Sequence, residues 1–159
     1  MSTVPGEHAS PTQPFPTKPP PFAHQGVTYE DLIDFTPDLA ARAQAQARRL
    51  LLGPIFTPPS LISTEPGNTQ GTLALPGSWG SGNWNTGAFD PETGYLYVPS
   101  ITAPFVADIV EGNPDRTNLA YVRGRRLWLG GPRGLPLFKP PYGRITAIDM
   151  SRGEIVWQV

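Results

Sequence analysis

A glycine-rich stretch that ends in an asparagine and a tryptophan is the part of this sequence best suited to hold a ligand. It reads Gly80-Ser-Gly-Asn-Trp-Asn85. Small residues let the backbone approach a planar molecule closely, and the Asn83 side chain offers both a donor and an acceptor to a carbonyl or carboxylate oxygen. The backbone N–H of Trp84 adds a second donor. This stretch is therefore the strongest local candidate for a ligand contact, through Asn83 and Trp84; the alternative is an ordinary glycine-rich hairpin with a packing tryptophan.

Other residue types that could carry chemistry lack the partners they would need. Ser78 and Ser81 have no nearby base, which argues against nucleophilic catalysis. His8 and His24 stand alone in a proline-rich segment, and the chain has no cysteine, so neither a metal site nor thiol chemistry is predicted. Gly130-Gly-Pro-Arg-Gly134 lacks the Lys-Ser/Thr of a phosphate-binding loop. We expect no catalytic residue and no metal ligand in this chain.

Two stretches share a pattern that predicts β-hairpins. They read Ala88-Phe-Asp-Pro-Glu-Thr-Gly-Tyr-Leu-Tyr97 and Ala147-Ile-Asp-Met-Ser-Arg-Gly-Glu-Ile-Val-Trp157. In each, the aspartate can accept backbone N–H bonds in the turn that it opens, and the glycine supplies the positive φ that closes it. Repeated sheets that each carry one aromatic are typical of propellers, so we interpret each stretch as the mark of one blade. Asp90 and Asp149 are expected to cap turns rather than to act as a catalytic pair.

The second of these stretches resembles the tryptophan-docking motif of the quinoprotein dehydrogenases, the propeller enzymes that depend on pyrroloquinoline quinone (PQQ). Its alanine, aspartate, glycine and tryptophan match the pattern Ala-x-Asp-x-x-Thr-Gly-x-x-x-Trp, whereas Arg152 stands at the threonine position. The first stretch has Tyr97 where the family usually has tryptophan. Further segments resemble the glucose-dehydrogenase-type branch, so that the resemblance covers nearly the whole chain: Ser10-Pro-Thr-Gln-Pro-Phe-Pro16, Gly53-Pro-Ile-Phe-Thr-Pro-Pro59, Gly71-Thr-Leu-Ala-Leu-Pro-Gly77, Gly82-Asn-Trp84 and Gly134-Leu-Pro-Leu-Phe-Lys-Pro-Pro-Tyr-Gly143.

The resemblance implies part of a PQQ-dependent dehydrogenase that oxidises a sugar or an alcohol. It implies that Asn83 and Trp84 contact PQQ, and that Trp157 stacks against an adjacent blade. We expect Trp79 and Trp128 to have structural roles as well. The family's catalytic aspartate and Ca²⁺ ligands match nothing here, so we expect them in the remaining blades of the parent propeller, outside this C-terminal-region fragment. A periplasmic location is also implied, although the first residues are no signal peptide. The alternative is a non-catalytic, propeller-like interaction fragment.

Composition favours a loop-rich, all-β protein. The 159 residues include 21 prolines and 17 glycines, and only 16% are charged. We predict a partial β-propeller of about two blades, with one helical insertion and long Pro/Gly-rich loops, because closed propellers need at least ~4 blades. A net charge of −1 gives no electrostatic footprint for nucleic acid. No run of residues is apolar enough to predict a membrane segment.

Three segments are expected along the chain. Residues 1–27 form a proline-rich extended loop, and residues 28–53 a helical insertion. Residues 54–159 form the blades, with a long loop at 99–143 in which Lys139 is a solvated side chain. The strands are predicted at residues 72–75, 86–89, 95–98, 127–129, 144–148 and 154–159.

The helical insertion carries two start signals. Thr28 and Asp31 have the spacing of a capping box, and Thr36-Pro37-Asp38 combines an N-cap, a proline at the first helical position and an acid in the first turn. Leu39, Ala43 and Ala47 recur at helical spacing. We expect this apolar stripe to pack on the propeller, and Gly53 to end the helical region.

Overall fold

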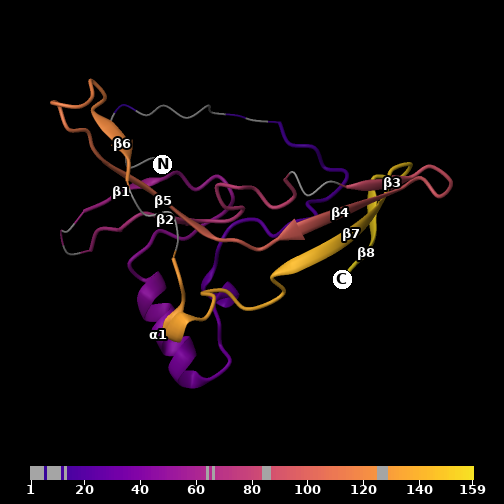
Figure 1. Cartoon of the computed structure of the whole chain (residues 1–159), viewed down its shortest axis with the longest axis horizontal. Helices are drawn as coiled ribbons and strands as arrows, with labels where there is room; N and C mark the ends of the chain where they lie inside the picture. Colours follow the sequence, from indigo (N-terminus) through magenta and orange to yellow (C-terminus); the bar gives the residue numbers. More distant parts are fainter. Residues whose placement is uncertain are drawn as a thin grey trace.

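Short strands connected by long loops dominate the computed structural model, which describes residues 6, 12, 14–63, 65, 67–83, 87–124 and 129–159. Figure 1 shows α1 below one end of an elongated arrangement of strands. Within the described residues, the strands form two four-stranded sheets, with no closed ring. The elements are η1 (Tyr29–Asp31), α1 (Pro37–Ala47), β1 (Ser60–Leu61), β2 (Thr72–Ala74), β3 (Ala88–Asp90), β4 (Tyr95–Ile101), β5 (Phe105–Glu111), β6 (Tyr121–Arg123), η2 (Pro132–Gly134), β7 (Gly143–Asp149) and β8 (Glu154–Gln158).

One sheet is an antiparallel ladder in the order β3-β4-β7-β8. The two hairpin stretches build it together: the first forms β3 and β4, and the second forms β7 and β8. The two hairpins join where β4 pairs with β7 over seven residues. Our interpretation that each stretch marks a separate blade is therefore wrong. The segment between the hairpins leaves this sheet and contributes strands to the other one.

A single row of side chains across this sheet explains the alanine and the aromatic residue of both stretches. The register aligns Ala88 with Tyr97, Tyr97 with Ala147, and Ala147 with Trp157. The rings of Tyr97 and Trp157 lie with centroids 5.8 Å apart, and Ala147 between them has no exposed surface. A small residue on the central strand lets two large aromatics on the flanking strands meet over it. Trp157 thus packs on an aromatic of its own sheet.

The other sheet contains β1, β2, β5 and β6 and supports α1. Strand β5 pairs with β1 in parallel and with β2 and β6 in antiparallel. The predicted apolar stripe of α1 is buried, as expected, with Leu39, Ala43 and Ala47 in one cluster with residues of β2 and β5. The helix begins as predicted, because the Thr36 hydroxyl accepts a hydrogen bond from the Leu39 N–H at 3.3 Å. None of the helices in the described part of the chain has the length and apolarity that a membrane crossing requires.

Element boundaries differ from the predictions most clearly in three places. The helix ends at Ala47, well before Gly53, because Leu51 forms a parallel bridge with Thr72 and draws the chain into the sheet. The segment 99–143, predicted as a long loop, contains β5 and β6. The predicted strand at 127–129 falls largely outside the described residues, and Leu129 is not in a strand.

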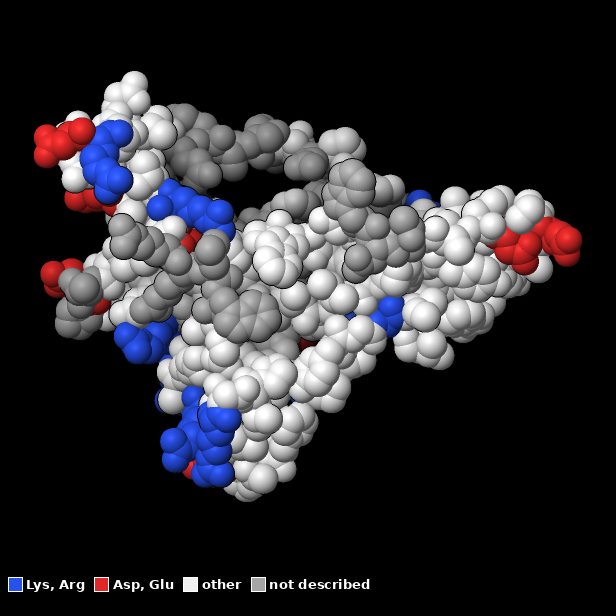
Figure 2. Space-filling model, viewed as in Figure 1, with Lys and Arg blue, Asp and Glu red and all other residues white. Residues whose placement is uncertain are grey.

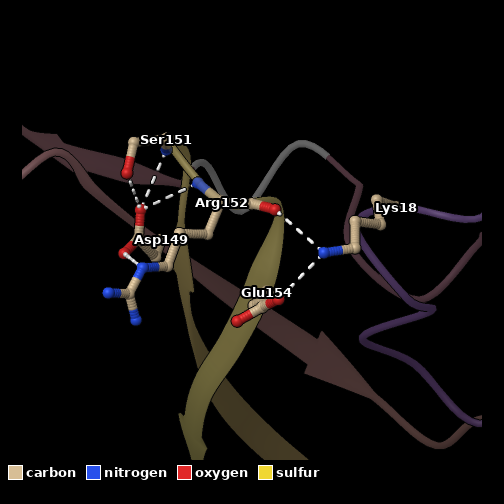
Figure 3. A network of polar contacts seen from close by, with 5 residues as sticks. All are labelled: Lys18, Asp149, Ser151, Arg152 and Glu154. Atoms are coloured by element: carbon tan, nitrogen blue, oxygen red, sulfur yellow. Dashed lines mark hydrogen bonds and ion pairs between the residues drawn. The ribbon is translucent and has the colours of Figure 1, made fainter.

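The proline-rich segment from residue 14 onward runs as extended chain past both sheets. The Phe22 carbonyl accepts a hydrogen bond from Gln158 Nε2 of β8 at 2.8 Å, and the Gly26 N–H donates to the carbonyl of Leu75 at 2.8 Å. The Lys18 ammonium pairs with Glu154 of β8 at 2.8 Å (Figure 3). Proline restricts the unfolded chain, which lowers the entropy cost of holding such a segment in place.

Candidate functional site

The loop that carries Asn83 follows β2 and lies beside the end of β4. The Gly80 N–H donates to the Gly77 carbonyl at 2.9 Å, which closes a tight turn. The Ile101 N–H, at the last residue of β4, donates to the Ser81 carbonyl at 2.9 Å. These two bonds fix the loop on the rim of the β3-β4-β7-β8 sheet.

Asn83 is exposed and keeps hydrogen-bonding capacity for a ligand. Its Nδ2 donates to the Trp79 carbonyl at 2.9 Å, and within the described part of the chain this is its one side-chain bond. The second N–H of the amide and the Oδ1 acceptor therefore remain available. Trp84, the other predicted contact, lies outside the described residues. The prediction that this pair contacts a cofactor stands as a prediction.

Gly80 and Gly82, the glycines of the predicted ligand-binding stretch, have different roles. Gly80 has a φ of +75°, and a Cβ added there would meet nothing within 4 Å, so the turn geometry alone favours glycine. A Cβ at Gly82 would lie 2.9 Å from the Phe22 ring and 3.2 Å from the Pro99 carbonyl oxygen. Because Gly82 has no side chain, Phe22 of the proline-rich segment can pack closely against this loop. That these glycines also leave room for a ligand stays a prediction.

Trp79 differs from the structural role predicted for it, because 73% of its surface is exposed. It stands on the same loop as Asn83 and presents a flat aromatic surface there. Such a surface can stack on a planar ring system. The signal that could have indicated it is its position four residues before Asn83, directly before the glycine-rich stretch. Trp128 lies outside the described residues.

The aspartates of the two hairpins are turn caps, as predicted. Asp149 accepts hydrogen bonds from the Ser151 hydroxyl at 2.6 Å and from the backbone N–H groups of Ser151 and Arg152 (Figure 3). The Ser151 hydroxyl is the main reason that the pKa of Asp149 lies below its ordinary value. Asp90 has a lowered pKa mainly because the Thr93 hydroxyl donates to it at 2.7 Å. Carboxylates held ionised in this way are poor proton carriers at neutral pH.

The glycines that close both turns also match their predicted role. Gly94 has a φ of +71° and Gly153 a φ of +65°. Each donates its N–H to the carbonyl of its aspartate, Asp90 or Asp149, at 2.8 Å. No group of three or more His, Cys, Asp or Glu side chains suited to a metal ion occurs among the residues that the structure describes.

Comparison with known proteins identifies the family. The whole chain, residues 1–159, matches the family described as PQQ: glucose/ethanol/alcohol dehydrogenase, β-propeller domain. The chain belongs to this family. The two four-stranded sheets without a closed ring fit part of such a propeller. No solved structure matches the chain.

Its curated relatives are much longer proteins. It is 30% identical to the quinoprotein glucose dehydrogenase of Escherichia coli, over 96% of this chain and 20% of that protein. It is 25% identical to the quinate/shikimate dehydrogenase (quinone) of Acinetobacter baylyi, over 100% of this chain and 21% of that protein. It is 26% identical to the glycerol dehydrogenase large subunit of Gluconobacter oxydans, over 98% of this chain and 23% of that protein. The chain thus spans about a fifth of the length of these relatives.

Proposed function

We propose that this chain forms part of a PQQ-dependent dehydrogenase that oxidises a sugar or an alcohol. The observation that carries the proposal is the family match over all 159 residues, together with an exposed asparagine whose amide retains a donor and an acceptor. The chain spans about a fifth of its relatives. We therefore propose that the catalytic base, a Ca²⁺ ion and most of the substrate site are supplied by the remaining blades of a longer protein, in the periplasm.

The loop at residues 76–83 fits an oxygen-rich planar cofactor in two respects. Asn83 can donate its second amide N–H to a quinone or carboxylate oxygen of PQQ. Trp79 can cover a ring face, because its indole is exposed on the same loop. Trp84 would add its backbone N–H. The chemistry that PQQ supplies when bound is acceptance of the electrons removed from the substrate, whereas the residues of this chain would bind and orient it.

The test is a PQQ titration of the apoprotein that carries this segment in its full-length form. Asn83→Ala should weaken PQQ binding by about 1–3 kcal/mol, the usual scale for removing one partner of a buried hydrogen bond. The matched control is Asn68→Ala, since Asn68 also makes one side-chain bond within an exposed loop, to Ser63 at 3.0 Å. Unchanged PQQ affinity in Asn83→Ala would remove the cofactor assignment and favour the non-catalytic interaction fragment.

A further inference from the structure

A small polar cavity lies near the loop of Asn83 and has no role in the function proposed above. Its volume is about 90 Å³. Three basic side chains surround it, together with one acid, one hydroxyl and a wall of rigid apolar residues. The lining residues are His24, Asp31, Thr102, Phe138, Lys139, Pro140, Pro141 and Arg144.

Backbone pairing between distant segments builds this cavity. Leu32 and Phe138 form an antiparallel bridge, and the Lys139 N–H donates to the Asp31 carbonyl at 3.0 Å. The Thr102 N–H, just after β4, donates to the Tyr142 carbonyl at 2.8 Å, just before β7. The cavity is therefore held by main-chain bonds between segments far apart in the sequence.

The acid in the cavity is fully engaged by its neighbours. Oδ1 of Asp31 lies 3.1 Å from Nε2 of His24. Its Oδ2 accepts hydrogen bonds from the N–H of Thr28 at 2.6 Å and from the Thr28 hydroxyl at 3.0 Å. Lys139, which was predicted to be a solvated loop lysine, pairs instead with Asp34 at 3.2 Å. Both carboxylates close to the cavity thus have side-chain or backbone partners of their own.

Arg144 is the basic residue here without a carboxylate partner among the residues that the structure describes. It is half-buried, and its Nη1 donates to the Thr102 hydroxyl at 2.9 Å. Thr102 in turn donates to the Pro141 carbonyl at 3.0 Å, which fixes the orientation of that hydroxyl. A guanidinium carries five N–H donors in a planar fork, so most of them remain for an oxygen ligand. An oriented, half-buried and unpaired guanidinium is suited to a carboxylate.

A second polar group beside Arg144 also lacks a partner. Ser100 lies directly opposite Arg144 in the β4–β7 register. Its residue is only 3% exposed, and its hydroxyl has no hydrogen-bond partner within the described part of the chain. Buried hydroxyls are nearly always bonded in folded proteins. Because this hydroxyl is buried and Ser100 is not among the residues that line the cavity, the guanidinium of Arg144 is the group that faces a ligand there.

We propose that this cavity, which we call the Arg144 pocket, binds a carboxylate group, with Arg144 as its anchor. A volume of about 90 Å³ is far below the ~300–1,000 Å³ of pockets that enclose whole ligands, so it suits a substituent. The carboxylate belongs to an acidic polyol substrate or to PQQ itself. The pocket adjoins the Asn83 loop, because Ile101, next to Thr102, is bonded to Ser81. This inference extends the proposed function. It rests on that function where PQQ is the source of the carboxylate.

The experiment measures binding to the full-length apoprotein by calorimetry, with quinate, its methyl ester and PQQ as probes. Arg144→Gln should lower the affinity for one carboxylate probe by about 10- to 100-fold, the range expected for hydrogen bonds to a charged group, without changing that for the ester. Arg144→Lys should retain part of the affinity that Arg144→Gln loses. Arg133→Gln is the matched control, since Arg133 is exposed and pairs with Asp38 at 2.8 Å.

The outcomes separate the two sources of the carboxylate. Loss of quinate affinity alone assigns the pocket to an acidic substrate, and loss of PQQ affinity alone assigns it to the cofactor. Unchanged affinity for both probes overturns the proposal. If Arg144→Gln does not fold, Thr102→Val decides, because it removes the hydroxyl that orients the guanidinium; unchanged affinities there also overturn it. PQQ binding that responds to Asn83→Ala but not to Arg144→Gln leaves the proposed function intact.

Discussion

At the scale of single residues, two tryptophans of this chain have opposite environments. Trp157 packs on Tyr97 over the buried Ala147 and is 41% exposed, whereas Trp79 is 73% exposed on the loop of Asn83. Burial and stacking contribute to the stability of the fold, whereas an exposed ring contributes little until a ligand covers it. Stability and cofactor affinity should therefore depend on different tryptophans.

We predict that Trp157→Ala lowers the free energy of unfolding by about 1–3 kcal/mol, less than the ~3–5 kcal/mol of a fully buried tryptophan. PQQ affinity should stay unchanged once unfolded protein is accounted for. Trp79→Ala should do the reverse, weakening PQQ binding with little loss of stability. Urea unfolding and PQQ titration of both full-length variants measure this. Equal effects of the two substitutions on stability would contradict the assignment.

The residues whose roles depend on near neighbours in the sequence were predictable. Asp90, Asp149, Gly94 and Gly153 act within their own turns, so spacing alone indicates their roles. Arg144 was not singled out, because its importance depends on contacts distant in sequence and on its having no carboxylate partner among the residues that the structure describes. The exposure of Trp79 also depends on the three-dimensional arrangement, which the local sequence does not encode.

At the scale of elements, hairpins were predictable but their pairing was not. Each turn is specified by residues that lie close together, whereas the β4–β7 ladder joins segments separated by the excursion through β5 and β6. Strand β5 (Phe105–Glu111) was not predicted, because its flanking Gly and Pro favour a loop interpretation. Its pairing with β1, β2 and β6 shows only in the three-dimensional structure. Similar turns in one chain therefore indicate hairpins, without showing which sheet each one joins.

The turn carboxylates make the β3–β4 and β7–β8 hairpins sensitive to acid. The folded pKa values of Asp90 and Asp149 lie below the ordinary value of 3.8. Their stabilising effect is thus present above pH 3.8 and is lost as the pH falls through the lower folded values. Ser151→Ala should reduce this loss, because the Ser151 hydroxyl is the main cause of the Asp149 shift. Thermal unfolding between pH 2 and 6 measures the effect, with Ser78→Ala as the control. Identical pH profiles for Ser151→Ala and wild type would contradict the prediction.

At the scale of the whole molecule, strand-rich composition and family motifs were enough to predict part of a propeller. The sheets that the chain forms leave apolar surface uncovered. Ile101, Ile145, Trp157 and Val159 are 39–77% exposed, and the register places them on the same face of the β3-β4-β7-β8 sheet as Tyr97. In the view of Figure 2, the surface over this sheet is largely uncharged, with acidic side chains at its far tip. Charged side chains are thus scarce on the side of this sheet that the figure shows.

We predict that the 159-residue chain on its own self-associates through this face at micromolar concentrations, because contiguous exposed apolar surface favours association. Light scattering coupled to size-exclusion chromatography measures the mass in solution. Ile145→Lys, which places a charge in the middle of the face, should shift the population toward monomer. Leu119→Lys is the matched control, since Leu119 is 61% exposed between β5 and β6, away from that sheet. A wild-type chain that is monomeric and melts cooperatively would show that this face needs no covering surface, and would count against placing the chain within a larger propeller.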